Sequence, residues 1–220
     1  MKIFFIINVF LLICIEVFGF HHTPLSPKNE NAILLNGAKL NVLSNTCYSE
    51  PQDSNCTHID SPWRLNPISP INSFGTSSHY EHKYIHNISN IVFKDEKKTI
   101  VIGYAADGFA ILSPYIKDGK KIKKVRSSYR LKKGKRKAIK GINPGGKYNG
   151  KYRDDYEYVK GLGDLDECNG MFVNGKYAYY ITEEFPYMLA CFKGTPKKTK
   201  LKNLENKYIL NNKNIAHATD

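Results

Sequence analysis

The sequence predicts a mainly β fold, with one β-rich domain of sandwich or barrel-like form, few short helices and disulfide bonds. Short runs of β-branched and aromatic residues are separated by Gly, Asn and Pro, which is typical of strands joined by turns. Helical periodicity is weak throughout. The 220 residues, 41% hydrophobic and 24% charged, suffice for a single domain and exclude collagen, coiled coils and wholesale disorder.

The N-terminus has the form of a secretory signal peptide over residues 1–19. Met1-Lys2 precedes an apolar run from Ile3 to Ile15, and Val17 and Gly19 stand three residues and one residue before the expected cleavage point. An uncleaved membrane anchor is the alternative, but the run is shorter than the ~20 apolar residues that span a bilayer. We therefore expect a secreted, extracellular protein, with no transmembrane segment after cleavage.

The mature chain is expected to contain a flexible segment at 20–31, the β-rich domain at 32–196, and a Lys/Asn-rich tail at 197–220. Asn36-Gly37 and Asn174-Gly175 indicate tight hairpin turns, because both residue types tolerate positive φ angles. The expected strands, in chain order, are Ala32–Leu35, Lys39–Leu43, Ile91–Phe93, Thr99–Ala105, Ala110–Leu112, Ser127–Leu131, Tyr156–Val159, Lys176–Thr182 and Met188–Phe192.

Four cysteines remain once Cys14 is removed with the signal peptide, an even number that favours two disulfides in an oxidising compartment. Three pairings are possible. We expect Cys47–Cys56, which brackets a short turn-rich segment, and Cys168–Cys191, which brackets a strand pair.

One strongly basic segment accounts for the net charge of +13. Residues 117–140 carry thirteen of the 33 basic residues and one of the 20 acidic ones, so the remainder has 20 basic and 19 acidic residues and is nearly neutral. The segment could bind an extracellular polyanion, such as a glycan or a lipid surface, while secretion argues against intracellular nucleic acid. The alternative is a set of solvated strand ends and a loop. The candidate polyanion-binding residues are Lys120, Lys121, Lys123, Lys124, Lys132, Lys133, Lys135, Arg136 and Lys137.

Several motifs occur in an order that resembles the YHYH-domain proteins. They include GYAADGF at 103–109, PGGKYNGKYRDDYEY at 144–158, GDLDECNG at 163–170 and CFKGTP at 191–196. The resemblance is strongest over 80–196 and implies a family of often secreted proteins with no established reaction. The Tyr-His-Tyr-His signature falls on Lys83-Tyr84-Ile85-His86, so only its last histidine is kept, and Met171 replaces the usual Arg.

A divalent metal ion, copper, zinc or calcium, is the cofactor that these motifs suggest. His79, His82 and His86 are three and four residues apart, so their imidazoles could converge in a tight loop or helical turn. Carboxylates that could complete the site are Asp107, Asp164, Asp166 and Glu167. The alternatives are histidines bonded to backbone, and a structural turn at 163–170 in which Asp and Asn cap backbone amides.

A further copper or nickel site would follow from cleavage after Gly19. The mature chain would then begin Phe20-His21-His22, and its α-amine, two amides and the His22 imidazole suit a square-planar ion. As for catalysis, the sequence has no Gly-x-Ser-x-Gly or His-Glu-x-x-His motif. Catalytic residues therefore cannot be named. A hydrolase using the carboxylates with His86 is the remaining enzymatic interpretation.

Overall fold

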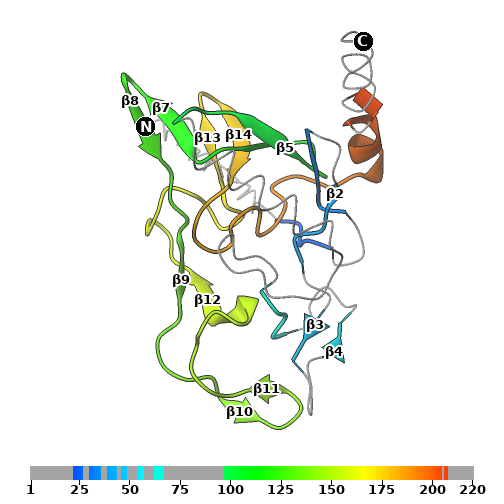
Figure 1. The fold of residues 1–220 in the computed structure, drawn as a ribbon, viewed down its shortest axis with the longest axis vertical. Coiled ribbons are helices and arrows are strands. Elements are labelled where there is room, and N and C mark those ends of the chain that lie inside the picture. Colours follow the sequence, from blue (N-terminus) through cyan, green and yellow to red (C-terminus); the bar gives the residue numbers. More distant parts are fainter. Residues whose placement is uncertain are drawn as a thin grey trace, which may run out of the picture.

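A computed structural model of the chain describes residues 22–26, 30–35, 39–43, 46–48, 54–56, 62–66, 97–204 and 206–207. The mainly β fold is confirmed. Its centre is a six-stranded sheet in the order β13-β14-β6-β5-β1-β2 (Figure 1). These strands are β1 (Ala32–Leu34), β2 (Lys39–Leu40), β5 (Val101–Ala105), β6 (Ala110–Leu112), β13 (Gly170–Val173) and β14 (Lys176–Tyr180).

The remaining strands form two-stranded ribbons. The ribbons are β3 (Thr46–Cys47) with β4 (Ser54–Asn55), β7 (Tyr115–Asp118) with β8 (Lys121–Lys124), β9 (Tyr129–Leu131) with β12 (Tyr156–Tyr158), and β10 (Ala138–Ile139) with β11 (Asn143–Pro144). A 3-10 helix spans Arg153–Asp155, and an α-helix covers 198–204 and 206–207. The β7–β8 hairpin lies towards one end of the long axis and β10–β11 towards the other (Figure 1).

The sheet is covered on both faces, because side chains of β14 alternate between two apolar clusters. Tyr177 and Tyr179 belong to the larger cluster, which also holds Ile33 and Ile111, whereas Ala178 and Tyr180 belong to a smaller one. The pairing of β14 with β6 is parallel, and all other pairs in the sheet are antiparallel. A strand buried on both faces reads as a continuous apolar run, as residues 177–180 do.

The β1–β5 pair depends on a glycine at one position of close approach. A Cβ atom added to Gly103 would lie 2.4 Å from the carbonyl oxygen of Ile33 on the neighbouring strand. Because real Cβ atoms do not approach an oxygen so closely, only glycine allows the two strands to pair here.

Most of the expected strands are present. The turn at Asn174-Gly175 is confirmed, with φ angles of 50° and 75° between β13 and β14. Strands β1 and β2 pair antiparallel on either side of Asn36-Gly37, but those two residues and the expected strand Ile91–Phe93 lie outside the described residues.

The expected strand Met188–Phe192 is wrong. Its backbone bonds to the preceding loop instead of to a strand: the carbonyl of Met188 accepts the Asn169 side-chain amide at 2.6 Å, and Ala190 N–H donates to the Cys168 carbonyl at 3.2 Å. Only Phe192 forms an isolated bridge, to Thr23. The apolar side chains in this segment fill the core rather than mark a strand.

Both expected disulfides, Cys47–Cys56 and Cys168–Cys191, are present. Disulfides are compatible with an oxidising extracellular compartment. The expected signal peptide lies outside the described residues, and secretion stays a prediction. In the part of the chain that the structure covers, no helix has the length and apolar character needed to cross a membrane.

Candidate functional site

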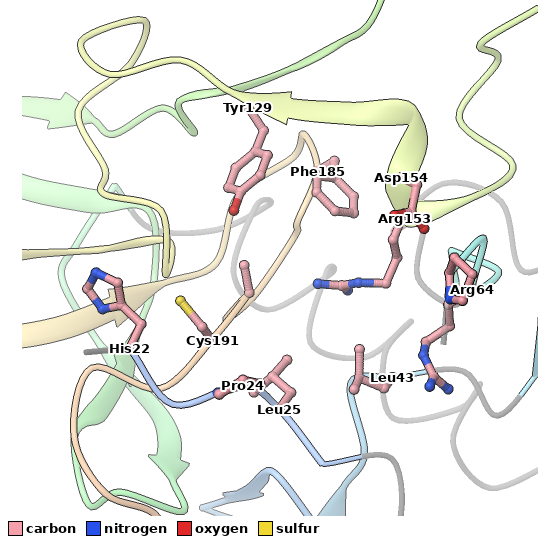
Figure 2. Close-up of a pocket in the computed structure, with 12 residues that line it drawn as sticks. His22, Pro24, Leu25, Leu43, Arg64, Tyr129, Arg153, Asp154, Phe185 and Cys191 are labelled. Atoms are coloured by element: carbon pink, nitrogen blue, oxygen red, sulfur yellow. The ribbon is translucent and has the colours of Figure 1, made fainter. Parts of the chain in front are cut away.

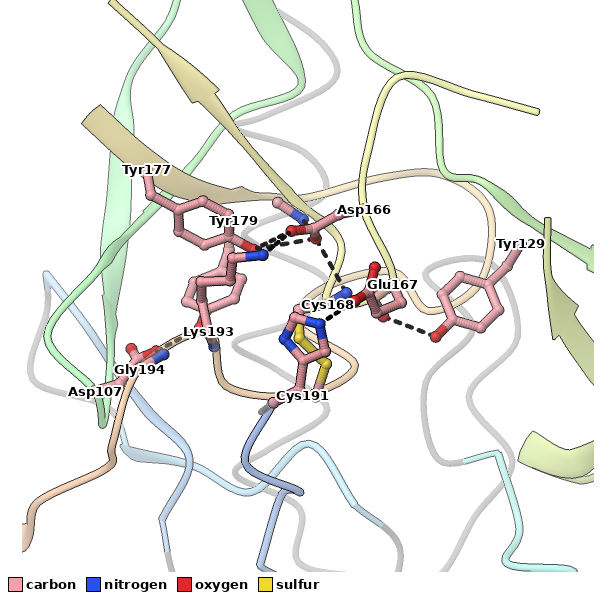
Figure 3. Close-up of a disulfide and its surroundings, with 12 residues drawn as sticks. Asp107, Tyr129, Asp166, Glu167, Cys168, Tyr177, Tyr179, Cys191, Lys193 and Gly194 are labelled. Atoms are coloured by element: carbon pink, nitrogen blue, oxygen red, sulfur yellow. Dashed lines mark hydrogen bonds and ion pairs between the residues drawn. A yellow bond between two sulfur atoms is a disulfide. The ribbon is translucent and has the colours of Figure 1, made fainter. Parts of the chain in front are cut away.

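The carboxylate of Asp166 organises the acidic loop that follows β12 (Figure 3). It accepts the backbone N–H groups of Cys168 and Gly170, each at 3.0 Å, and the Tyr177 hydroxyl at 3.1 Å. The ammonium group of Lys193 lies 3.2 Å away. These contacts give Asp166 a structural role as the cap of the loop.

The two other acidic side chains of this loop also have protein partners. Asp164 accepts the backbone N–H of Arg126 at 2.9 Å and pairs with Lys123. The carboxylate of Glu167 pairs with His22 Nε2, and its backbone carbonyl accepts the Tyr129 hydroxyl at 2.7 Å.

Asp107 is buried in the turn between β5 and β6 (Figure 3). Its carboxylate accepts the Tyr179 hydroxyl at 2.5 Å and the Gly194 N–H at 3.0 Å. Burial, reinforced by Asp107, raises the pKa of Tyr179 well above its ordinary value, so this hydroxyl stays protonated and keeps donating.

The predicted metal ligands are therefore dispersed. Asp107, Asp164, Asp166 and Glu167 form no cluster of three ligand atoms among the described residues. His82 and His86 lie outside these residues, as do Phe20 and His21 of the N-terminal copper site. Metal binding by either set stays a prediction.

The basic segment is spread along the molecule rather than gathered in one patch, since β8 and β10 lie towards opposite ends (Figure 1). Lys123 and Lys124 pair with Asp164 and Glu183, and Lys132 donates to the Asp154 carbonyl at 2.8 Å. Among the described residues, the exposed lysines of this segment without an ion pair or side-chain hydrogen bond are Lys117, Lys120, Lys121, Lys133, Lys135, Lys137 and Lys140.

Arg136 differs from the other residues of the basic segment, because its side chain is 5% exposed. Its guanidinium forms two 2.6 Å hydrogen bonds with the carboxylate of Asp155. This guanidinium therefore serves the fold and is not part of an exposed basic surface.

A pocket of about 480 Å³ lies between the N-terminal segment, the 3-10 helix and the segment around the Cys168–Cys191 disulfide (Figure 2). Its apolar wall includes Leu25, Leu43 and Phe185. Polar groups line it as well, among them two arginines, Arg64 and Arg153. The pocket combines an apolar lining with a few converging polar groups, as ligand sites generally do.

Arg153 extends from the 3-10 helix into this pocket (Figure 2). Its guanidinium lies 5.2 Å from the centre of the Phe185 ring. Among the residues that the structure describes, it has no ion pair or side-chain hydrogen bond. The pKa of Arg153 is lowered from 12.5 to about 10, mainly by burial and to a smaller extent by the charge of Arg64, while Tyr129 and Asp154 oppose the shift. The group remains cationic at neutral pH.

Arg64 is 3% exposed and brings a second positive charge to the pocket. Its guanidinium donates to the Cys56 carbonyl at 3.3 Å, and burial lowers its pKa. The carboxylate of Asp154 also lines the pocket but accepts the Trp63 N–H at 2.8 Å. Arg64 and Arg153 thus place two positive charges beside the carboxylate of Asp154 in the described lining of the pocket.

A family model described as YHYH protein matches residues 19–194. The chain belongs to the YHYH family. No curated protein and no solved structure matches it. The family match confirms the resemblance expected from the motifs. Because it brings no known activity, the candidate site of this YHYH protein is inferred from the pocket and the side chains that line it.

The sequence interpretation missed the pocket of this YHYH protein. Arg153 lies within the family-like motif at 144–158 and outside the run of lysines. Its place in that motif was the only feature of the sequence that could have pointed to a role in ligand binding. No sequence pattern pointed to Arg64 as a pocket residue, because most of its neighbours in the pocket come from distant parts of the chain.

Proposed function

We propose that this YHYH protein binds a small organic anion, a carboxylate or a phosphate ester, in the pocket around Arg153. One observation carries the proposal: the Arg153 guanidinium extends into a pocket with an apolar wall and, among the described residues, contacts the Phe185 ring but has no ion pair or side-chain hydrogen bond. Arg153 is partly buried, and a partly desolvated charge is stabilised by pairing, which an anionic ligand would supply.

The guanidinium specifies the kind of anion. Its planar fork of N–H donors matches carboxylate and phosphate oxygens in a two-bond arrangement. Leu25, Leu43 and Phe185 would contact the apolar part of the ligand, and about 480 Å³ is the space that a small organic molecule needs. The ligand therefore has one anionic end and one apolar body.

Arg64, the second arginine in the pocket lining, also favours a negatively charged ligand. Burial lowers the pKa of both arginines, and an anion in the pocket would offset this cost of burying positive charge. The Tyr129 hydroxyl is already used by the Glu167 carbonyl, so we assign it to the wall rather than to the ligand contact.

Calorimetric titration with benzoate, phenyl phosphate and uncharged benzamide tests the proposal. We expect benzoate or phenyl phosphate to bind saturably and benzamide not to bind. Arg153→Gln should weaken anion binding about 10- to 100-fold, the value of a hydrogen-bonded charge. Arg130→Gln removes an exposed arginine of β9 and is the matched control, with unchanged affinity expected.

Folding of the variants is checked separately. Arg153→Gln removes an unpartnered charge, so the free energy of unfolding should stay constant or rise. Arg153→Lys keeps the charge without the fork and should give an intermediate affinity. The proposal fails if neither anion binds, or if Arg153→Gln binds as tightly as the unchanged protein.

Binding of an extracellular polyanion through the exposed lysines is the second candidate. The observation that favours it is the β7–β8 hairpin, which lies towards one end of the molecule and whose Lys120 and Lys121 are exposed. We infer a contact that depends on net charge and falls with salt. Metal binding through His82, His86 and the acidic loop is less favoured, because the loop carboxylates already hold protein donors.

A further inference from the structure

We propose that reduction of the Cys168–Cys191 disulfide converts it, together with His22, into a zinc-binding site. An imidazole nitrogen of His22 and the two Sγ atoms lie within 4.8 Å of one another. In the disulfide the sulfur atoms are not thiolates and do not bind zinc. Once reduced, two cysteines and one histidine provide the donor set that Zn(II) prefers.

The orientation of His22 leaves one nitrogen for a metal. Its Nε2 faces the Glu167 carboxylate, whereas its Nδ1 is buried without a hydrogen-bond partner among the described residues. Buried polar atoms of this kind are rare in folded proteins and call for an explanation. A carboxylate that holds one imidazole nitrogen while the other binds metal is a recurrent arrangement in zinc sites.

The three ligands stay together without the disulfide bond. Thr23, next to His22, and Phe192, next to Cys191, exchange two backbone hydrogen bonds of 3.0 and 2.8 Å. The Cys168 N–H is held by Asp166 at 3.0 Å, and its carbonyl accepts the Ala190 N–H at 3.2 Å. The backbone therefore fixes the positions of all three residues before a metal binds.

The pocket gives access to this site. His22 and Cys191 both line it, so a reductant and a metal ion can approach from there (Figure 2). A tetrahedral zinc ion would take its fourth ligand from water in the pocket, while Glu167 holds the imidazole. The inference does not depend on the proposed organic anion.

The chemistry balances with a named reductant. A dithiol gives two electrons and two protons to the Cys168–Cys191 bond and becomes a disulfide itself, leaving two protein thiols. Zinc binding then releases the two thiol protons to solvent. Reoxidation by the disulfide form of the same reagent, which takes two electrons from the cysteine sulfurs and two protons from solvent to become the dithiol again, would re-form the Cys168–Cys191 bond and release the metal, so occupancy follows the redox state.

Co(II), a spectroscopic substitute for zinc, tests the site in a full-length Cys47→Ser/Cys56→Ser background that retains only this disulfide. After reduction with a phosphine, which gives two electrons to the disulfide and takes an oxygen atom from water to become its oxide, one cobalt per chain should bind with thiolate charge-transfer absorption. The oxidised protein should show no such band. Added Zn(II) should displace the cobalt.

Variants identify the ligands. His22→Ala should weaken cobalt binding by at least about tenfold, and Glu167→Gln, which loosens the imidazole, by about 10- to 100-fold. Glu183→Gln, at a surface pair with Lys124, is the matched control and should change nothing. Unchanged affinity in His22→Ala would overturn the assignment.

The zinc proposal can still be tested if the protein loses structure when the Cys168–Cys191 disulfide is reduced. Zinc binding that builds a site also stabilises the fold, so Zn(II) should raise the melting temperature of the reduced chain or restore its circular dichroism. A reduced protein that neither takes up cobalt nor responds to zinc contradicts the proposal.

Discussion

Arg136 and Asp155 form the most deeply buried ion pair among the described residues, with side chains 5% and 0% exposed. Burial alone would raise the pKa of Asp155, but the hydrogen bonds from Arg136 and from the Tyr152 and Asn149 backbone outweigh it and lower this pKa. The same carboxylate accepts the Gly150 N–H at 2.9 Å. Asp155 thereby joins the loop at 145–152 to the 3-10 helix that carries Arg153.

Asp155→Asn should lower the free energy of unfolding by about 3–5 kcal/mol, because Arg136 is left buried without a counter-charge. Glu157→Gln, which breaks the exposed pair with Arg130, is the control and should cost less than about 1 kcal/mol. Chemical denaturation measures both. Equal effects of the two substitutions would refute the distinction between buried and exposed pairs.

The pH dependence follows from the same carboxylate. The folded pKa of Asp155 lies below its ordinary value of 3.8, so the charged form is favoured in the folded state. Its contribution is fully present above the unfolded pKa and is lost as the pH falls through the folded pKa. Acid denaturation of Asp155→Asn should lack this part of the pH dependence.

The roles of single side chains were harder to predict from the sequence than the strands or the family. Arg136 and its neighbouring lysines belong to one basic run, and composition cannot show which cation turns inward. The carboxylate partner decides this, and Asp155 lies 19 residues further along the chain. By contrast, the cysteine pairs were predictable, because each encloses a short local unit.

At the level of elements, the contact between β1 and β5 leaves no space for a side chain at Gly103. Gly103→Ala should cost about 1–3 kcal/mol or more, because the methyl group would collide with the Ile33 carbonyl rather than with a flexible side chain. Val101→Ala, at an exposed position of the same strand, is the control and should have a small effect. Thermal unfolding monitored by circular dichroism compares the two, and similar melting temperatures would contradict the expected collision.

Strands and turns were predictable where the residues that determine them are close together in the sequence. The Asn174-Gly175 turn fixes its own hairpin, and the apolar runs at 101–105 and 110–112 mark paired strands. The expectation failed at Met188–Phe192, whose apolar side chains are buried in irregular backbone. Its hydrogen-bond partners, around Cys168, lie about twenty residues away, beyond the reach of a period-two pattern.

At the level of the whole molecule, the excess of positive charge should produce salt-sensitive retention on immobilised heparin. Lys120→Gln/Lys121→Gln should elute at lower salt than Lys197→Gln/Lys198→Gln, which removes the same charge from exposed positions near the C-terminal helix. Equal shifts would show that only net charge matters. A hairpin contact would then be excluded.

The pocket likewise depends on the fold of the whole chain, because its lining residues come from segments far apart in the sequence. Its walls come from residues near 22–25, 43, 62–64, 129, 153–154 and 185–191. No motif contains such a set, so the sequence supplied the family and the strands but not the site. A charged pocket between separate segments becomes visible only once the chain has folded.

The bridge between Thr23 and Phe192 also sets an order of events during synthesis. The central sheet likewise places β1 and β2, near the start of the chain, in one layer with β13 and β14, near its end. β6 therefore lacks its neighbour β14, and Thr23 lacks its partner Phe192, until those later residues have been synthesised, and contacts so distant in sequence form slowly. Chaperones have a time window in which to engage the chain before these contacts close.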